Sequence, residues 1–398
     1  MKSFLVALLL SFAVAVQAQA GAKAPASVDG GDYIYISAQG PRGADGALPA
    51  TFAAQARQAF NNLKSVVESA GLTMNNVVYT TVYLTDIGQY AEMNGAFGEA
   101  FKSIPPACAV LGVAALPDPP IEINAVAVRN LSDRHAVSPP NLKWDEASSP
   151  GILTHDRLFV SAMPGTDPAS GRTSNDPATQ VDFALDRMKA VVEAAGLKLG
   201  NMVFVNPFLT VQIPMRVMNQ HYAQRFEFGN SPARATIEVT SLPNGAQIEY
   251  TGVAVRDLKE RRAVRPKNMP PSPTASPCVF AGDTLYCSAK SGFIPGPNEG
   301  VYFSTTPLQL VQTMRNQLDN LEEADMDFSQ VVSTTVYLDN VTDLPAFNEV
   351  YGKYFKGTLP AQTTLQQIAP ADRRPDKDEH YPDLEQVSLI AVRKGPKH

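Results

Sequence analysis

Apolar residues recur at every third or fourth position in three separate stretches of the chain. This spacing places them on one face of an α-helix, so each stretch predicts a long amphipathic helix that packs on a core. The three apolar stripes are Phe52, Ala56, Phe60, Leu63, Val67 and Ala70; Val181, Leu185, Met188, Val192 and Ala195; and Leu310, Met314, Leu318 and Leu321.

After each of these helices the pattern changes to a run rich in β-branched and aromatic residues, which favours a strand. The runs are VVYTTVYL from Val77, MVFVNPFL from Met202 and VVSTTVYL from Val331. A strand that ends in Ser-Ala precedes each long helix, and a short helix with an asparagine follows each run. The Ser-Ala pairs are 37–38, 161–162 and 288–289, the asparagines are Asn94, Asn219 and Asn348, and Pro-Ala pairs at Pro106, Pro232 and Pro360 then open the last strands.

These features repeat with one period: Asp32, Asp156 and Asp283, which precede the Ser-Ala strands, are 124 and 127 residues apart. The order of elements predicts an α+β fold in each unit, with helices on one face of a mixed sheet. The other sheet face would be left exposed, so we expect the three units to pack around a pseudo-threefold axis as a monomeric pseudo-trimer. The predicted units are residues 21–133, 134–262 and 263–398.

The first 20 residues differ from the rest of the chain. Lys2 precedes an apolar run from Phe4 to Val16, and Ala18-Gln19-Ala20 follows it. This run is too short to cross a hydrocarbon core of about 30 Å as a helix, and the pattern is that of a cleavable signal peptide. The sequence therefore predicts a secreted or periplasmic protein that has no membrane partner after cleavage.

Composition excludes several classes of protein. The chain of 398 residues is 44% hydrophobic and 18% charged, which is typical of globular proteins, and its formal charge of -6 disfavours a nucleic-acid partner. The five histidines form no ligand-spaced pair, the three cysteines form no Cys-x-x-Cys, and no glycine-rich phosphate loop follows a strand. We expect no metal and no cofactor.

Cys278 and Cys287 flank Gly282-Asp283 symmetrically. In a two-residue hairpin they form a directly opposite, non-hydrogen-bonded pair with a Cα separation of about 4.5 Å. This separation is at the short end of the disulfide range, and export supplies an oxidising environment. The sequence therefore predicts a Cys278–Cys287 disulfide and leaves Cys108 free.

Several motifs together resemble the RidA/YjgF family, which is also called endoribonuclease L-PSP. They are QARQAFNNLKSVVESAGL from Gln55, VVYTTVYLTD from Val77, Asn94, Pro232-Ala233-Arg234-Ala235-Thr236, and Leu242-Pro243 followed by Ile248-Glu249. The resemblance implies chorismate-mutase-like units, trimeric assembly and ligand clefts between units. It also implies hydrolysis of imines or enamines derived from amino acids, which gives ammonia and a 2-keto acid.

Arg234 and Glu249 are the candidate catalytic residues. A guanidinium pairs bidentately with the carboxylate of a small metabolite, and a carboxylate can assist attack by water. The resemblance implies that Arg234 and Glu249 reach one cleft, although their spacing alone also fits an ordinary salt bridge. The other expected substrate-binding residues are Thr236, Ser161, Ala162, and either Asn94 or Asn348 from the neighbouring unit.

The other two units depart from this pattern. Cys108 and Gln362 stand at the position of Arg234, Glu122 and Glu385 are taken as the matches of Glu249, and the family's Gly-Pro-Tyr motif has no convincing counterpart. Two functions therefore stay open: a deaminase with one intact cleft, or a non-catalytic small-carboxylate-binding or scaffold protein. The acidic chain without a histidine pair disfavours RNA cleavage.

Overall fold

The computed structural model describes residues 23–144, 146–267, 269–294 and 301–394. The predicted signal peptide, residues 1–20, lies outside this range. The described residues form three consecutive α+β units, each with a mixed sheet and two α-helices. Unit 1 contains β1 (Ser27–Asp29), β2 (Tyr33–Gln39), α1 (Phe52–Ser69), β3 (Val77–Leu84), α2 (Tyr90–Ala100), β4 (Ala107–Gly112) and β5 (Ile121–Val128).

The other two units follow the same order, with an additional strand at the start of each, and with two short strands in unit 2 at the place of β4. Unit 2 contains β6 (His135–Val137), β7 (Gly151–Leu153), β8 (Arg157–Pro164), α3 (Pro177–Ala194), β9 (Met202–Leu209), α4 (Met215–Ala223), β10 (Ala233–Arg234), β11 (Ile237–Glu238) and β12 (Ile248–Val255). Unit 3 contains β13 (Arg261–Val264), β14 (Cys278–Ala281), β15 (Thr284–Ser291), α5 (Thr306–Glu323), β16 (Val331–Leu338), α6 (Leu344–Tyr351), β17 (Ala361–Gln366) and β18 (Glu385–Val392).

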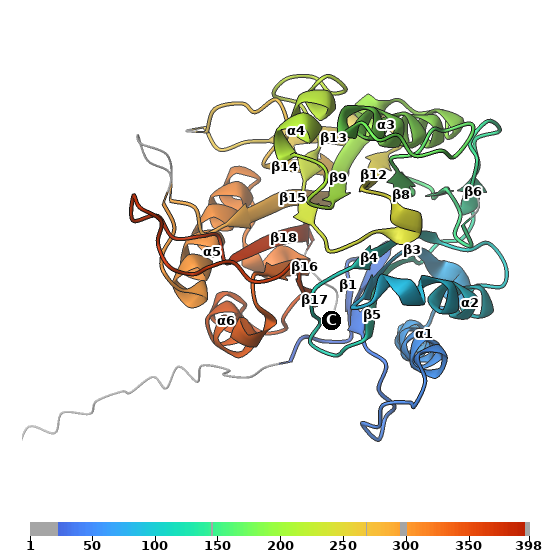
Figure 1. The fold of residues 1–398 in the computed structure, drawn as a ribbon, viewed down its shortest axis with the longest axis horizontal. Helices are drawn as coiled ribbons and strands as arrows, with labels where there is room; N and C mark the ends of the chain where they lie inside the picture. The colour runs from blue at the N-terminus through green and yellow to red at the C-terminus, as the bar shows by residue number, and fades with distance from the viewer. Residues whose placement is uncertain (1–22, 145, 268, 295–300, 395–398) are drawn as a thin grey trace, which may run out of the picture.

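Each sheet is mixed, as predicted. In unit 1 the strand order is β1-β2-β5-β3-β4, with β3 parallel to β4 and antiparallel to β5. The helices lie on the outside of the molecule and the strands toward its centre (Figure 1). The predicted stripe of α1 is buried against the sheet from Phe52 to Val67, and Gly71, at φ +75°, ends this helical segment.

The inner sheet faces pack against one another. Tyr83 of unit 1, Phe208 of unit 2 and Tyr337 of unit 3 belong to one buried apolar cluster. The three sheets therefore bury the faces that their helices leave uncovered.

Three equivalent hydrogen bonds connect the units. The backbone N–H of Cys108 donates to Ser161 Oγ at 2.8 Å, that of Arg234 to Ser288 Oγ at 2.8 Å, and that of Gln362 to Ser37 Oγ at 2.9 Å. These bonds run from unit 1 to unit 2, from unit 2 to unit 3, and from unit 3 to unit 1.

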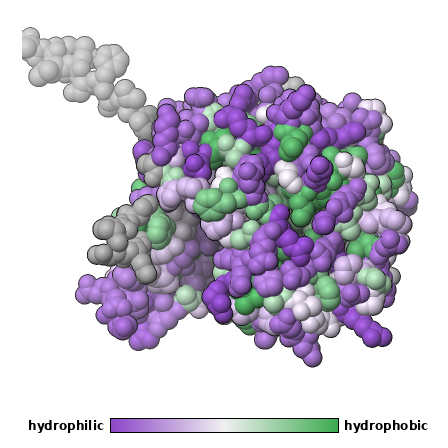
Figure 2. Space-filling model, turned by 90° about the horizontal axis from the view of Figure 1, so that it is seen from above, coloured by the Kyte–Doolittle hydropathy of each residue, from purple (hydrophilic) through white to green (hydrophobic). Residues whose placement is uncertain are grey.

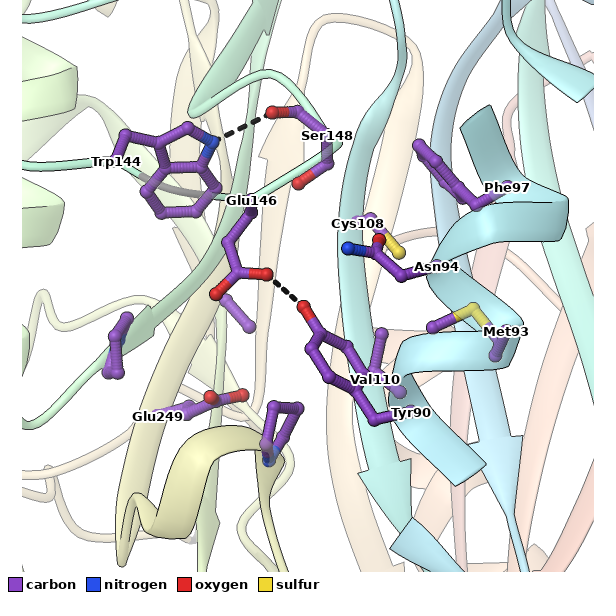
Figure 3. A pocket seen from close by; sticks show the side chains of 13 residues that line it. Tyr90, Met93, Asn94, Phe97, Cys108, Val110, Trp144, Glu146, Ser148 and Glu249 are labelled. Atoms are coloured by element: carbon purple, nitrogen blue, oxygen red, sulfur yellow. Dashed lines mark hydrogen bonds between the residues drawn. The ribbon is translucent and has the colours of Figure 1, made fainter. Parts of the chain in front are cut away.

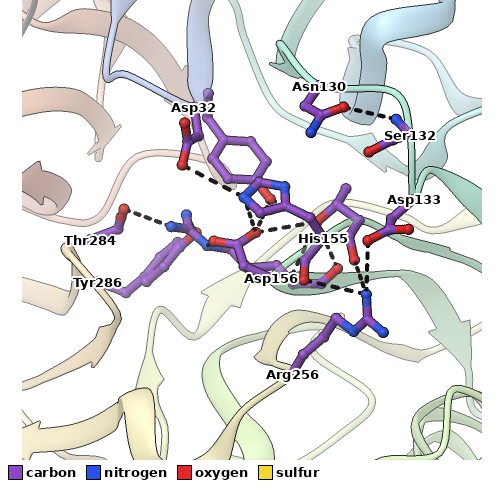
Figure 4. Close-up of polar contacts among 12 residues, drawn as sticks. Asp32, Asn130, Ser132, Asp133, His155, Asp156, Arg256, Thr284 and Tyr286 are labelled. Carbon is purple, nitrogen blue, oxygen red and sulfur yellow. Dashed lines mark hydrogen bonds and ion pairs between the residues drawn. The ribbon is translucent and has the colours of Figure 1, made fainter.

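A polar junction joins all three units near the starts of β2, β8 and β15 (Figure 4). The Arg157 guanidinium is 4.4 Å from the centre of the Tyr33 ring and donates to Thr284 Oγ1 at 2.8 Å. These three residues take the same position in their units, immediately after Asp32, Asp156 and Asp283. One buried cation thus contacts the equivalent residue of both other units.

The predicted hairpin is present in unit 3. Ala281 pairs with Thr284 and Cys278 with Cys287 across the Gly282-Asp283 turn, and the two cysteines form a disulfide with a Cα separation of 4.0 Å. Gly282 has φ +58°, a backbone conformation that glycine adopts without strain. Cys108 is free and buried.

Candidate functional site: two clefts between units

The Arg234 cleft lies between units 2 and 3. Asn219 on α4, together with Arg234 and Thr236, forms the side contributed by unit 2. Unit 3 contributes Ser288, Ala289 and Lys290 from β15 and Gln386 from β18. The 269–277 segment supplies the remaining wall, with Met269, Pro270, Ser272, Ala275, Ser276 and Pro277.

Asn219 and Tyr222 hold the Arg234 side chain. Arg234 Nη1 donates to Asn219 Oδ1 at 2.7 Å, and the guanidinium carbon is 5.2 Å from the centre of the Tyr222 ring. Burial lowers the pKa of Arg234 from its usual value, since desolvation disfavours the charged form. Among the described residues no carboxylate pairs with this guanidinium, so its remaining donors are available to an anion in the cleft.

The Glu249 cleft lies between units 1 and 2. Tyr90, Asn94 and Cys108 of unit 1 face Trp144, Glu146 and Glu249 (Figure 3). Trp144 Nε1 donates to the backbone oxygen of Ser148 at 2.7 Å, and the Tyr90 hydroxyl donates to the Glu146 carboxylate. At the position equivalent to Arg234, this cleft has the thiol of Cys108.

Glu249 is 4% exposed, and its Oε2 atom has no hydrogen-bond partner among the described residues. Burial raises the pKa of Glu249 well above its usual value, and the Glu146 charge raises it further. Burial also raises the pKa of Glu146, and it raises that of the Cys108 thiol to about 12. This cleft therefore presents two weakly acidic carboxyl groups and an unreactive thiol.

The prediction that Arg234 and Glu249 share a cleft is wrong. Arg234 lines the cleft between units 2 and 3, whereas Glu249 lines the cleft between units 1 and 2. The reason is that β10 and β12 flank β9 on opposite sides, so they face different neighbouring units.

Other predicted site residues are also placed differently. Ala162 lines the Glu249 cleft, and Ser161 accepts from the Cys108 backbone rather than contacting the Arg234 cleft. Asn94 lies in the Glu249 cleft, and Asn348, on α6, does not line the Arg234 cleft. Thr236 is in the Arg234 cleft as expected, and the asparagine that contacts Arg234 is Asn219 of the same unit.

Strand register also corrects the match of Glu249 in unit 3. Ile121, Ile248 and Glu385 pair with the equivalent residues Leu84, Leu209 and Leu338. Glu122, Glu249 and Gln386 are therefore equivalent, and Glu385 was the wrong match. Glu385 instead lies beneath α5, where Thr313 donates to its carboxyl group, and burial raises the pKa of Glu385 well above its usual value.

The clefts between units therefore combine different residues. Cys108 and Glu249 line the cleft between units 1 and 2, and Arg234 and Gln386 line the cleft between units 2 and 3. At the contact between units 3 and 1, where the Gln362 backbone N–H donates to Ser37 Oγ, the equivalent positions carry Gln362 and Glu122. Burial raises the pKa of Glu122 to about 8. Thus none of the three contacts between the described units combines the clamp arginine with the glutamate. Lys290 and Gln386 of the Arg234 cleft were not predicted, because sequence spacing does not reveal which unit follows which around the axis.

The comparisons with known proteins identify the class to which this fold and these clefts belong. The model of the family Endoribonuclease L-PSP matches residues 17–129, 145–256 and 268–370. The chain therefore belongs to the endoribonuclease L-PSP family, also known as RidA/YjgF, and contains three tandem copies of its unit.

Individual relatives match one unit each. The 2-iminobutanoate/2-iminopropanoate deaminase of Escherichia coli (strain K12) is 44% identical over 108 residues, which are 26% of this chain and 84% of that protein. The Homo sapiens protein of the same name is 40% identical over 109 residues, covering 27% of this chain and 79% of that protein.

Among solved structures, the Escherichia coli YjgF gene product is 39% identical, with a TM-score of 0.26, and covers 27% of this chain and 94% of its own. A chorismatase structure covers 80% of this chain and 93% of its own, with a TM-score of 0.54 and 12% identity. This second likeness concerns the fold alone, and it extends over more than one unit.

None of the helices among the described residues is long and apolar enough to cross a membrane. In the same part of the chain no group of three or more His, Cys, Asp or Glu side chains is arranged to hold a metal ion.

Proposed function

We propose that the protein binds small 2-imino and 2-oxo acids through their carboxylate in the Arg234 cleft and hydrolyses the imines there. The observation that carries this proposal is the Arg234 guanidinium, which lies in an inter-unit cleft without a carboxylate partner among the described residues. The names of the curated relatives support imine hydrolysis as the activity.

The chemistry needs little from the protein beyond orientation. An imine carbon is already electrophilic, and Arg234 would anchor the substrate carboxylate bidentately while the Asn219 amide fixes the guanidinium. Attack by water forms a carbon–oxygen bond and breaks the π bond of the imine, whose electron pair moves to nitrogen. The nitrogen takes up the two protons of the water, and cleavage of the remaining carbon–nitrogen bond releases ammonia and a 2-oxo acid. Gln386 can accept a hydrogen bond from the water but cannot take its proton, so we expect slow turnover.

A second function, carboxylate binding without turnover, is favoured by one observation. Glu249 lies outside the Arg234 cleft, and the equivalent residue inside it is Gln386. A cleft that has Arg234 but no glutamate would still bind a carboxylate and would not catalyse hydrolysis.

One experiment separates these functions. Calorimetry with 2-oxobutanoate measures binding, and an assay with an imine generated in situ from an amino acid measures hydrolysis. Arg234→Ala should weaken binding by about 2 to 5 kcal/mol if the ion pair is desolvated, and it should abolish any turnover. Binding without turnover in the parent supports the second function, and unchanged binding in Arg234→Ala refutes both.

We also propose that the chain is an exported, covalent counterpart of a cyclic trimer. Three equivalent inter-unit serine hydrogen bonds support the assembly. The apolar run after Lys2 supports export. Intact-mass measurement on protein from its native compartment would test export, since cleavage after Ala20 gives a chain that begins at Gly21.

A further inference from the structure

A cavity lies where the inner faces of the three sheets meet. Its volume is about 110 Å³, and all three units contribute to its lining. None of its described lining residues lines the Arg234 cleft or the Glu249 cleft. An apolar cavity of about 150 Å³ accommodates benzene, so this central cavity is of the same order of size as a single aromatic ring.

One layer of the cavity lining repeats in all three units. In unit 1, Val126 of β5 pairs with Tyr35 of β2 on one side and with Tyr79 of β3 on the other. The equivalent positions carry Phe159, Val253 and Phe204 in unit 2, and Tyr286, Ile390 and Ser333 in unit 3. All nine residues line the cavity, and each unit has an aliphatic residue between two flanking positions. Aromatic rings occupy every flanking position except that of Ser333.

The flanking rings form stacks between neighbouring units. Tyr79 of unit 1 stacks on Phe159 of unit 2, with ring centres 6.5 Å apart. Phe204 of unit 2 stacks on Tyr286 of unit 3, with ring centres 5.8 Å apart. In both pairs the ring planes are inclined by 28°.

The third stack lacks one of its two members. Unit 3 contacts unit 1 as unit 1 contacts unit 2, so the residues at the equivalent positions are Ser333 and Tyr35. Serine has no ring to place on Tyr35. The cavity therefore includes the place that an aromatic side chain occupies at the other two contacts.

The lining also limits the charge of a ligand. Among the described residues, no Asp, Glu, Lys, Arg or His side chain lines the cavity. Burial raises the pKa of Tyr35 and of Tyr79 above the usual value, so both phenols stay uncharged. A charged ligand would lose its hydration here without gaining a counter-ion.

One polar group of the lining lacks a partner. Oδ1 of Asn206 is buried and accepts no hydrogen bond from the described residues. A buried acceptor without a donor costs free energy, and a hydroxyl or N–H group on a ligand would remove this cost. The cavity thus combines a missing ring with an unused acceptor.

We propose that the central cavity binds an uncharged molecule with one aromatic ring and a hydrogen-bond donor. The ring takes the place that Ser333 leaves open and stacks on Tyr35, and the donor group bonds to Asn206. This site is separate from the Arg234 cleft and does not depend on the proposed hydrolysis of imines.

The first test compares phenol with cyclohexanol, which has the same number of heavy atoms and one hydroxyl group but no flat ring. Calorimetry should show that phenol binds at least fivefold more tightly, because a planar ring can stack on Tyr35. Equal affinities, or no binding of phenol, would overturn the proposal.

Ser333→Phe introduces the residue found at the equivalent position 204 and should fill the cavity. We expect it to weaken phenol binding at least tenfold without lowering Tm, since the added ring completes the third stack. Ser65→Phe, at an exposed position on α1, is the matched control and should keep the affinity of the parent for phenol within about twofold. Unchanged phenol binding in a folded Ser333→Phe variant would show that the site lies elsewhere.

A crystal structure of the parent with phenol tests the position directly, whether or not Ser333→Phe folds. It should show the ring between Ser333 and Tyr35, and water alone in the cavity would refute the proposal. Arg234→Ala should leave phenol binding unchanged, because Arg234 lies outside the cavity. Loss of phenol binding and loss of 2-oxobutanoate binding therefore report on two different proposals.

Discussion

At the scale of single residues, Arg234 and Glu249 lie in different clefts. Arg234 faces Gln386, and Glu249 faces Cys108. The group proposed to bind a carboxylate and the buried acid are therefore separated, and each can be changed without disturbing the other.

The first prediction concerns the geometry of the clamp. Arg234→Lys should bind 2-oxobutanoate more weakly than the parent and more tightly than Arg234→Ala, because an ammonium retains the charge but loses the planar fork. Calorimetry on the three proteins provides the comparison. Equal affinities for the parent and Arg234→Lys would show that charge alone holds the ligand.

The second prediction restores the missing acid. Gln386→Glu places a carboxylate opposite Arg234, where it can accept a proton from the attacking water, so imine hydrolysis should increase by about tenfold or more. Gln212→Glu, at an exposed position outside this cleft, is the control for added charge. No gain in kcat for Gln386→Glu would indicate that the cleft cannot position the water.

The third prediction concerns the pKa of Glu249, which burial raises well above its usual value in the folded protein. Ionising this carboxyl group therefore costs more free energy in the folded protein than in the unfolded chain. The unfolded chain releases this proton near pH 4.5, whereas the folded protein retains it to higher pH, so the free energy of unfolding falls as pH rises above that value. Glu249→Gln should reduce this loss and raise Tm at neutral pH. It should leave ligand binding in the Arg234 cleft unchanged.

Thermal unfolding of the parent and Glu249→Gln between pH 4 and 9 measures this difference. Glu122→Gln is a useful comparison, because burial raises the pKa of Glu122 to about 8 while its Oε1 accepts a hydrogen bond from the Asp118 backbone N–H at 2.7 Å. A Tm difference that is independent of pH would contradict the assignment for Glu249.

The error at Glu385 shows what a sequence cannot resolve at this scale. Glu385 and Gln386 are adjacent, and adjacent residues of a strand point to opposite faces of the sheet. A shift of one residue moved the acid from a cleft to the core beneath α5. Only the pairing of β18 with β16 decides between these positions.

At the scale of elements, the sequence was far more informative. Periodicity predicted the three long helices, because a stripe that must be buried leaves a strong pattern. The wrong pairing of Arg234 with Glu249 arose between elements, since the spacing of β10 and β12 in the chain does not state which neighbouring unit each strand faces.

The fourth prediction concerns the β14–β15 hairpin. Cys278 and Cys287 are fully buried, and their disulfide restricts the unfolded chain. The double variant Cys278→Ala/Cys287→Ala should lose about 2 to 4 kcal/mol of unfolding free energy, including the loss of the cross-link. Urea unfolding would measure this loss, with Cys108→Ala as a control for removal of a buried thiol. An equal loss in the control would show that packing, rather than the cross-link, accounts for the change.

At the scale of the whole molecule, the three units are not interchangeable, because equivalent positions at their junction carry different residues. Arg157 contacts Tyr33 and Thr284, which are different residues at equivalent positions. The face in Figure 2 shows small apolar patches among hydrophilic side chains. The inner sheet faces are already buried within one chain, as the shared cluster of Tyr83, Phe208 and Tyr337 indicates.

The fifth prediction follows from this burial. Because one chain already supplies three sheets, further copies have no inner sheet face to cover, and the protein should be a monomer. Light scattering should report the mass of one chain per particle. Arg157→Met removes the cation shared by the three units and should lower Tm without changing the particle mass, since the units remain covalently joined. A stable particle of three chains would mean that equivalent units pair between chains, and the proposed intramolecular ring would then be wrong.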